Sequence, residues 1–306
     1  MKHAQSRTEV DEEMRAHGLK TEGLSKKYRN FQLRDISLEV PAGSILGLLG
    51  RNGAGKTTAI KLISGHTKKS GGKIWIAQKD MDKEPIAARE QIGLILDEPM
   101  FFETKSLWEN GKAFGRFYSG FQEASFRNWL SVCKLNRSDW LGMLSKGDRI
   151  KFQFAFAVSH HPRVLLLDEP TGNLDPVFRK EFLNILQEVV EEEQIGVLFS
   201  SHLTSDLEQI ADVVALLEQG ELLYAESMEK LKSRYCLLKG DPQTGKKLKI
   251  SAEPGIIGIQ VSRVGFEAMA DLENVSENLQ NMMETIMQEE IDLSKWMYYM
   301  TKRARK

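Results

Sequence analysis

The sequence predicts an α/β fold whose main sheet is mostly parallel. Apolar runs as long as a strand alternate with helical patterns, which is typical of parallel strands covered by helices on both faces. Residues 31–40 instead alternate apolar and polar side chains, and a short strand is expected at 74–76. These two segments predict an antiparallel β subdomain packed against the parallel core. The apolar runs are 45–49, 92–96, 164–167, 195–199 and 213–217.

A glycine-rich segment follows the first of these runs. It reads Gly-Arg-Asn-Gly-Ala-Gly-Lys-Thr-Thr over 50–58 and precedes a helical pattern at 59–63. A strand, a glycine loop and a helix in this order favour a phosphate site, because backbone N–H groups and the positive helix end surround the anion. Lys56 can reach the β- and γ-phosphates, and Thr57 can ligate Mg²⁺. We therefore predict a P-loop NTPase core with Gly50, Asn52, Gly53, Ala54, Gly55, Lys56, Thr57 and Thr58 as nucleotide-binding residues.

Composition narrows the classes of function. The 306 residues are 41% hydrophobic with a formal net charge of −1, so a sizeable core can form and no overall charge draws the chain to nucleic acid or lipid. We find no apolar run near the ~18 residues of a membrane span and no apolar secretion signal. Two distant cysteines offer no disulfide framework. We expect a cytoplasmic, reduced protein that needs a separate subunit for any membrane role.

The pattern along the chain predicts three regions. Residues 1–18 form a polar extension, 19–226 the nucleotide-binding domain and 227–306 a small α+β accessory region. Within the nucleotide-binding domain, about 100–160 turns helical and aromatic, which predicts an inserted α-helical subdomain. Its aromatic residues recur at helical spacing, so we expect them in the core. The elements expected in the accessory region are short strands near Leu248 and at 256–261, and a helix over 275–291.

Two further strands end in residues suited to phosphate chemistry. Asp168 and Glu169 follow one strand and His202 follows the next. The carboxyl ends of parallel strands meet at one edge of a sheet, so these side chains should lie near the glycine loop. Asp168 is expected to hold Mg²⁺, directly or through water, and Glu169 to polarise the attacking water. Each is an ordinary strand end by itself, but their convergence favours catalysis, with His202 bonded to the γ-phosphate.

Together these motifs resemble the nucleotide-binding subunit of ABC transporters. The resemblance covers about 19–224, implies ATP as the nucleotide, and matches Glu169 to the catalytic base and His202 to the switch histidine. The motifs, in chain order, are the glycine loop, Leu-Ser-Lys-Gly-Asp at 144–148, Leu-Leu-Asp-Glu-Pro-Thr at 166–171, Asn-Leu-Asp at 173–175 and His202.

The resemblance assigns roles to other residues. It implies that Tyr28 stacks on adenine, that Ser145 and Gly147 cap the ATP held by the opposite subunit, and that Asp175 lies in the loop that touches across the dimer. Ser145 and the N–H groups near Gly147 precede a helical pattern at 150–158, which suits a second anion site. One subunit needs only one phosphate cradle, so a second suggests ATP sandwiched between two chains.

The sequence departs from the family pattern in two places. Lys146 and Asp148 stand in the signature that usually reads Leu-Ser-Gly-Gly-Gln. Asp97 occupies the place of a glutamine that reaches Mg²⁺ and couples to the membrane subunit, so Asp97 joins the predicted metal ligands. With Ser-His-His-Pro at 159–162, which we otherwise interpret as a connector, the chain looks most similar to bacterial exporter-type ATPases. These are the antibiotic-resistance, bacteriocin-immunity and YtrB-like group, which work with separate permease chains.

Several hypotheses follow for function. The main one is an ABC transporter ATPase with ATP and Mg²⁺, bound through permease subunits to the inner face of the cell membrane, in a homodimer or heterodimer and without nucleic acid. A soluble ABC ATPase acting on a ribosome or nucleic-acid complex is the alternative, but such members carry two cassettes or a long coiled coil. A GTPase is the third, since 136–139 mimic a guanine-reading motif, although in the wrong part of the chain. The substrate contacts lie in the permease.

Overall fold

The computed structural model describes residues 17–97 and 101–304. The chain divides into two compact units, one ending at Leu222 and the other beginning at Leu223; the sequence placed the boundary after residue 226. The predicted extension over 1–18 lies outside the described residues except for its last two, which open the first strand. Within the described ranges, no helix is both long enough and apolar enough to cross a bilayer.

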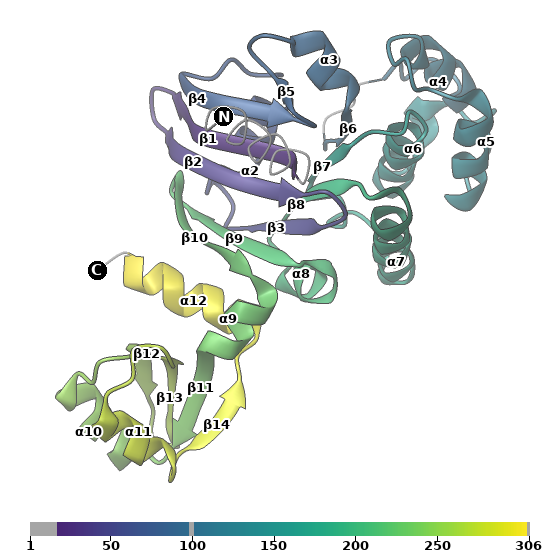
Figure 1. Ribbon diagram of the computed structural model, residues 1–306. Coiled ribbons are helices and arrows are strands. Elements are labelled where there is room, and N and C mark those ends of the chain that lie inside the picture. Colours follow the sequence, from purple (N-terminus) through teal and green to yellow (C-terminus); the bar gives the residue numbers. More distant parts are fainter. Residues whose placement is uncertain (1–16, 98–100, 305–306) are drawn as a thin grey trace, which may run out of the picture. The chain divides into compact units, whose positions relative to one another are not determined.

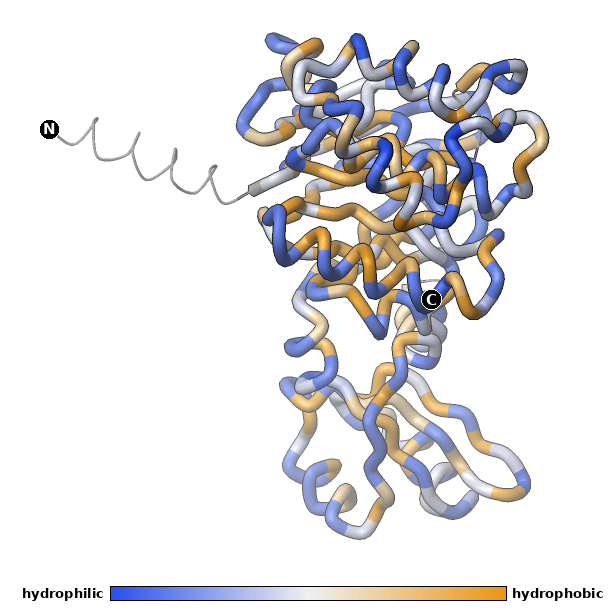
Figure 2. Tube along the Cα trace, turned by 90° about the vertical axis from the view of Figure 1, so that its right-hand side faces the viewer, coloured by the Kyte–Doolittle hydropathy of each residue, from blue (hydrophilic) through white to orange (hydrophobic). Residues whose placement is uncertain are grey.

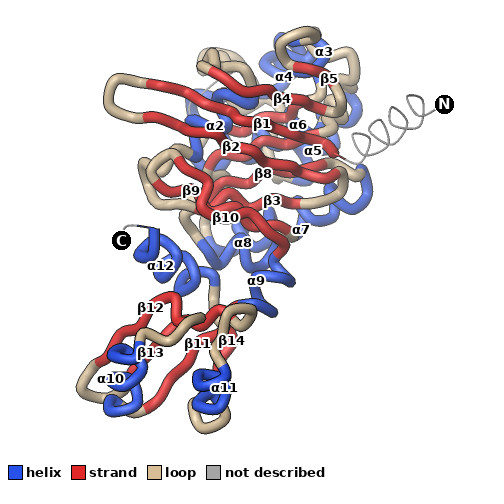
Figure 3. Tube along the Cα trace, turned by 60° about the vertical axis from the view of Figure 1, so that its left-hand side comes forward, coloured by secondary structure: helices blue, strands red, loops and turns tan. Residues whose placement is uncertain are grey.

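A ten-stranded sheet forms the centre of the first unit (Figure 1, Figure 3). Its strands in chain order are β1 (His17–Lys27), β2 (Gln32–Pro41), β3 (Ile45–Leu49), β4 (Gly71–Ile76), β5 (Lys79–Asp80), β6 (Ile92–Ile95), β7 (Val164–Asp168), β8 (Gly196–Ser201), β9 (Val213–Glu218) and β10 (Glu221–Ser227). The spatial order is β5-β4-β1-β2-β10-β9-β3-β8-β7-β6. Strands β9, β3, β8, β7 and β6 pair in parallel, whereas β2, β1, β4 and β5 pair antiparallel. The predicted parallel core with an antiparallel β subdomain is confirmed.

Burial explains why the two parts of the sheet differ in sequence. Every residue of β3, β7 and β8 is buried, as expected of strands with protein on both faces. Strand β2 instead alternates between exposed and buried positions along much of its length, because one of its faces points away from the core. Figure 2 shows the hydrophobic segments and the hydrophilic connections that separate them.

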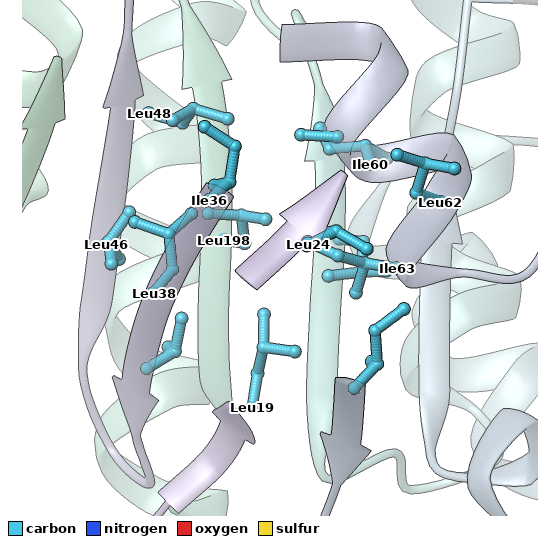
Figure 4. Packing of buried hydrophobic residues seen from close by; sticks show 14 of the residues in the cluster. Leu19, Leu24, Ile36, Leu38, Leu46, Leu48, Ile60, Leu62, Ile63 and Leu198 are labelled. Atoms are coloured by element: carbon cyan, nitrogen blue, oxygen red, sulfur yellow. The ribbon is translucent and has the colours of Figure 1, made fainter. Parts of the chain in front are cut away.

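Helices connect these strands. They are α2 (Lys56–Ile63), α3 (Pro85–Glu90), α4 (Leu107–Gly115), α5 (Glu123–Val132), α6 (Lys146–Val158), α7 (Pro176–Glu193) and α8 (Thr204–Ile210), with a 3₁₀ turn at Leu141–Met143. Helix α2 is fixed by aliphatic packing, since Ile60, Leu62 and Ile63 lie against Leu24 and Leu198 of the sheet (Figure 4). Each such fully buried side chain contributes about 1.5–3 kcal/mol, so the core anchors the helix that begins at the glycine loop.

The inserted helical subdomain has an aromatic core. Phe126 of α5 is fully buried and lies 5.9 Å from Trp108 and 6.1 Å from Phe152, measured between ring centroids. These rings lie in the core of the subdomain, as the sequence predicted for its aromatic residues. Phe117 differs, because 69% of its surface is exposed.

The second unit is α+β, as predicted. A four-stranded antiparallel sheet has the order β12-β13-β11-β14. The elements are α9 (Met228–Arg234), β11 (Tyr235–Gly240), α10 (Pro242–Ser251), β12 (Ile256–Val261), β13 (Phe266–Asp271), α11 (Glu277–Met283), β14 (Met287–Glu290) and α12 (Leu293–Ala304).

Two sequence predictions for this unit were wrong. Leu248 lies in α10, not in a strand; Asp241 caps this helix by accepting hydrogen bonds from Gln243 N and Thr244 N. The helix expected over 275–291 ends at Met283, and β14 follows it. Strand β14 pairs with β11, so a long-range backbone pairing overrides the local helical pattern there.

His160, which follows α6, is a buried titratable group in the first unit. Only 3% of its surface is exposed, its ring stacks on Tyr118 at 4.0 Å, and its Nε2 lies 3.1 Å from Ile92 O. Burial lowers the pKa of His160 to about 4. The folded protein therefore holds this ring neutral at a pH where the unfolded chain protonates it.

We predict that His160 makes folding sensitive to acid. Because its pKa is depressed in the folded state, stability is complete above the unfolded pKa of about 6.5 and falls as the pH approaches about 4. Substitution His160→Gln should remove about 2 kcal/mol of the difference between the unfolding free energies at pH 7 and pH 4.5, measured by urea titration. His161→Gln is the matched control, because His161 is exposed. Equal pH dependence in both variants would contradict this role of burial.

Candidate functional site

A cavity opens at the carboxyl ends of β3 and β7, and we call it the phosphate cavity. Its volume of about 430 Å³ is in the range of small-ligand sites. Of the predicted nucleotide-binding residues, Gly50 and Ala54 support the loop without lining the cavity. The other predicted residues of the glycine loop line the phosphate cavity together with Glu169. The lining residues are Phe31, Arg51, Asn52, Gly53, Gly55, Lys56, Thr57, Thr58 and Glu169.

The backbone of the loop requires its glycines. Gly53 and Gly55 have φ angles of 81° and 115°, which strain side-chain-bearing residues. A Cβ on Gly50 would lie 2.5 Å from Leu217 O. Helix α2 begins directly after Gly55, and within the described chain no side chain caps its first N–H groups. These donors and the positive helix end therefore suit an anion such as a phosphate.

Three predicted residues form one chain of contacts beside this loop. Lys56 is 6% exposed; its Nζ donates to Gly50 O at 2.8 Å and lies 3.1 Å from Glu169 Oε1. Glu169 Oε2 lies 2.6 Å from His202 Nδ1 and accepts a hydrogen bond from His202 N at 3.2 Å. The carboxylate of Glu169 is thus held between the lysine of the glycine loop and the histidine after β8.

Backbone conformation orients Glu169. Its φ of 50° is in the left-handed region, which is uncommon for a residue with a side chain. Its N–H lies 3.1 Å from both Ser200 O and Ser200 Oγ. Such strained residues occur at functional sites where the surroundings hold them. The contribution of Ser200 was missed by the sequence analysis, since nothing in the sequence around it indicates a contact over this separation.

Two predicted Mg²⁺ ligands lie at the same end of the sheet. Asp168 is 6% exposed and its Oδ1 accepts a hydrogen bond from Ser200 Oγ at 2.7 Å; Thr57 lines the phosphate cavity. In the described ranges no group of three or more His, Cys, Asp or Glu residues could hold a metal unaided. Mg²⁺ commonly takes only one or two protein ligands and completes its shell with phosphates and water. The residues present fit that kind of site.

The third predicted metal ligand, Asp97, lies elsewhere. It follows β6 and lines a second cavity of about 180 Å³, which we call the Asp97 cavity. The other residues around it are Phe101, Leu141, Lys146, Arg149, Ile150, Phe152 and Gln153. Gln153 bridges to the strand end, because its amide accepts from Leu96 N and donates to Leu96 O. The described lining of the two cavities has no residue in common, so the structure does not bring Asp97 to the phosphate cavity.

Tyr28 lies near the cavity but is not among the lining residues named above. It is 44% exposed and its ring lies 6.5 Å from that of Phe31, which does line the cavity. Phe31 was not predicted from the sequence, because its only signal was its place at the start of an alternating strand. The two rings together offer an apolar surface beside the phosphate-binding loop.

The remaining predicted residues cap helices away from the phosphate cavity. Ser145 is the N-cap of α6 and accepts a hydrogen bond from Asp148 N. Asp175 is the N-cap of α7 and accepts from Val177 N and Phe178 N. Gly147 lies beside the loop that leads to Asp175, since a Cβ on it would be 3.1 Å from Asn173 O. The structure therefore brings these two capped helix ends close to each other.

A buried polar network ties the loops of the site together. Thr171 Oγ1 donates to Asp206 Oδ2 at 2.6 Å, and Arg179 Nε donates to Asp206 Oδ1 at 2.7 Å. Thr171 follows Glu169 in the loop after β7, Arg179 belongs to α7, and Asp206 belongs to α8 after His202. Asp206 is 3% exposed, and removing Arg179 would leave its carboxylate buried without a cationic partner. No sequence motif indicated this network.

Comparison with known proteins gives consistent matches. The family described as ABC transporter matches residues 33–172. The uncharacterized ABC transporter ATP-binding protein YdbJ of Bacillus subtilis is 32% identical over 80% of this chain and 83% of its own length. The bacitracin transport ATP-binding protein BcrA of Bacillus licheniformis is 32% identical over 71% of this chain and 72% of its length. A solved ATP binding subunit of an ABC transporter is 26% identical, with a TM-score of 0.65, and the match covers 70% of this chain and 92% of that one.

We predict that Lys56→Ala weakens ATP binding on the order of 10- to 100-fold, the worth of a hydrogen bond to a charged group. The variant loses the cation of the phosphate cavity and leaves Glu169 without its partner at 3.1 Å. Isothermal titration calorimetry with Mg-ATP would measure the loss. Lys61→Ala is the control, because it removes a charge from the same helix outside the cavity lining. Equal affinities in both variants would rule out the phosphate cavity as the ATP site.

Proposed function

This chain belongs to the family of ABC transporter ATP-binding proteins, and we propose that it powers export through a separate membrane permease by joining with a second subunit around ATP. It is an ATPase of this family. The observation that carries the proposal is the Lys56–Glu169–His202 arrangement beside the glycine loop. It groups an ammonium, a carboxylate and an imidazole ring at one end of the sheet.

The contacts suggest how these residues act. Lys56 exchanges the Glu169 carboxylate for phosphate oxygens when a triphosphate enters, because a polyphosphate carries more negative charge. Glu169 is then free to accept a proton from the attacking water as general base. His202 keeps the carboxylate in place through the 2.6 Å contact of its Nδ1. Thr57 and Asp168 would hold Mg²⁺, which would neutralise charge on the phosphates.

The second anion site supports the sandwich. Ser145 and Gly147 lie at the start of α6, whose 13 residues give it a full positive end. Neither they nor Asp175 is among the residues that line the described phosphate cavity of the same chain. We infer that they contact ATP bound by a second subunit. One chain carries both half-sites, namely the phosphate cavity and the second anion site at the start of α6. A homodimer and a heterodimer are therefore both possible arrangements.

The Asp97 cavity is the proposed contact for the permease. It combines the apolar rings of Phe101 and Phe152 with charged groups at Asp97, Lys146 and Arg149, a mixture suited to burying part of another chain. Its neighbour Lys146 is the first residue of α6, so a contact there would reach the second anion site through one helix. The subunit then works on the cytoplasmic face of the membrane. Export as the direction rests on the resemblance to exporter-type ATPases.

We predict that Glu169→Gln keeps ATP binding and lowers hydrolysis ~10²-fold or more, since an amide cannot take a proton from water. Uncleaved ATP should then hold two subunits together, because a ligand bound only by the dimer stabilises it. Light scattering at high protein and ATP concentrations would detect the dimer. Adding Ser145→Arg should weaken it by blocking the opposing site. Hydrolysis at the parental rate would show that Glu169 is not the base, and a variant that binds ATP but stays monomeric with its permease would exclude the sandwich.

We also predict that Asp97→Gln leaves ATP affinity within about twofold, because Asp97 lies outside the phosphate cavity. The number of substrate molecules exported per ATP hydrolysed should change, since the cavity that meets the permease loses a charge. Transport into inverted membrane vesicles of the co-expressed complex, with ATP hydrolysis followed in parallel, measures this ratio. A shifted Mg²⁺ titration would instead place Asp97 with the metal. Unchanged titration and unchanged transport would exclude both roles.

A further inference from the structure

Asp148 is hydrogen-bonded to the Ser145 hydroxyl through both its carboxylate and its backbone N–H. Ser145 Oγ donates to Asp148 Oδ2 at 2.8 Å, and Asp148 N donates back to Ser145 Oγ at 3.1 Å. A serine hydroxyl has a single proton to donate. While that proton points to Asp148, Ser145 cannot offer it to a phosphate.

The carboxylate also weakens the attraction of α6 for an anion. Asp148 is the third residue of this helix, where a negative charge offsets the positive helix end. Burial opposes its charged form, yet hydrogen bonds from Lys151 and Ser145 hold the pKa of Asp148 below its ordinary value. The charge is therefore present at neutral pH.

Lys151 balances part of this charge. Its Nζ lies 2.8 Å from Asp148 Oδ1 and 4.1 Å from the centroid of the Phe178 ring. Phe178 N in turn donates to Asp175 at 3.0 Å. The side chain of Lys151 is only 16% exposed, which fixes the ammonium between the starts of α6 and α7. Loss of this cation would leave the Asp148 carboxylate uncompensated beside Ser145.

We propose that Asp148 is a positioning residue that holds the Ser145 hydroxyl away from the ATP of the opposite subunit, so that the Asp148–Lys151 pair sets the ATP concentration at which two subunits join. This inference rests on the proposed ATP sandwich and concerns the regulation of the same site. ATP must compete with Asp148 for the Ser145 proton and overcome the nearby negative charge. A dimer therefore forms only at a higher ATP concentration than the start of α6 would require without the Asp148 carboxylate.

The test uses the full chain carrying Glu169→Gln, so that bound ATP is not consumed. Sedimentation velocity measures the ATP concentration that gives half-maximal dimer. Adding Asp148→Asn should lower this concentration about 10-fold, because the amide is a weaker acceptor and carries no charge. The gain should shrink in 0.5 M salt, which screens partly exposed charges. Adding Lys151→Gln instead should raise the concentration several-fold.

A double-mutant cycle separates this role from simple helix capping. In the presence of Asp148→Asn, Lys151→Gln should lose most of its effect, because the charge that it balances is gone. Glu103→Gln is the matched control; it removes a carboxylate that pairs at 2.8 Å with Arg149 of the same helix, and it should leave the concentration unchanged. ATP affinity of the monomer, measured in dilute protein, should be the same in all variants.

The outcomes separate the role of Asp148 from the proposed ATP sandwich. If Glu169→Gln dimerises with ATP and Ser145→Arg weakens the dimer, but Asp148→Asn leaves the required ATP unchanged or raises it, the role of Asp148 is wrong and the sandwich stands. Equal effects of Lys151→Gln with and without Asp148→Asn would also overturn the role of the pair. If Glu169→Gln shows no ATP-dependent dimer, the proposed function and this inference fall together.

Discussion

Parallel pairing of β3, β7 and β8 is the constraint on which the site depends. Leu49 of β3 pairs with Ser201 of β8, and Asp168 of β7 pairs with Ser200. The strands therefore end level with one another, and the next residues are Gly50, Glu169 and His202. Aliphatic burial on both faces fixes this register, because a shift by one residue would turn buried side chains to the opposite face. The chemistry of the site follows from where these buried strands stop.

The sequence predicted this part of the molecule well for a physical reason. Uninterrupted apolar strands have few alternative structures, and a glycine loop between a strand and a helix carries its conformation in its residue types. Their order placed the phosphate loop, Asp168, Glu169 and His202 at one end of a parallel sheet. The family resemblance supplied what periodicity could not, namely the roles of Tyr28, Ser145, Gly147 and Asp175. Those roles remain predictions, as do the metal roles of Thr57, Asp97 and Asp168 and the catalytic roles of Glu169 and His202.

The missed features are contacts between distant segments. Asp206 meets Thr171 and Arg179 across 35 and 27 residues, and the contact of Ser200 with Asp168 spans 32. No local pattern encodes such pairs, because each partner is an ordinary polar residue in its own segment. The errors in the second unit have the same origin. The pairing of β14 with β11 decides the structure after Met283, and that pairing cannot be read from the helical spacing of Leu279 and Met283.

The two half-sites of this chain share one physical principle. In each of them a carboxylate of the protein occupies the group that is proposed to meet ATP: Glu169 lies on Lys56, and Asp148 lies on Ser145. A buried ammonium would be costly without a partner, so the Glu169 carboxylate stabilises the single subunit, whereas the Ser145 hydroxyl is exposed and already bonded to Asp148. The affinity for ATP then depends on how much more strongly the donors bind the phosphates than they bind the internal carboxylate. The proposed competition differs between the sites, because Glu169 is proposed to act as general base once Lys56 leaves it, whereas no step of the reaction is proposed for Asp148. Asp148 can therefore raise the threshold for joining two subunits without taking part in the reaction.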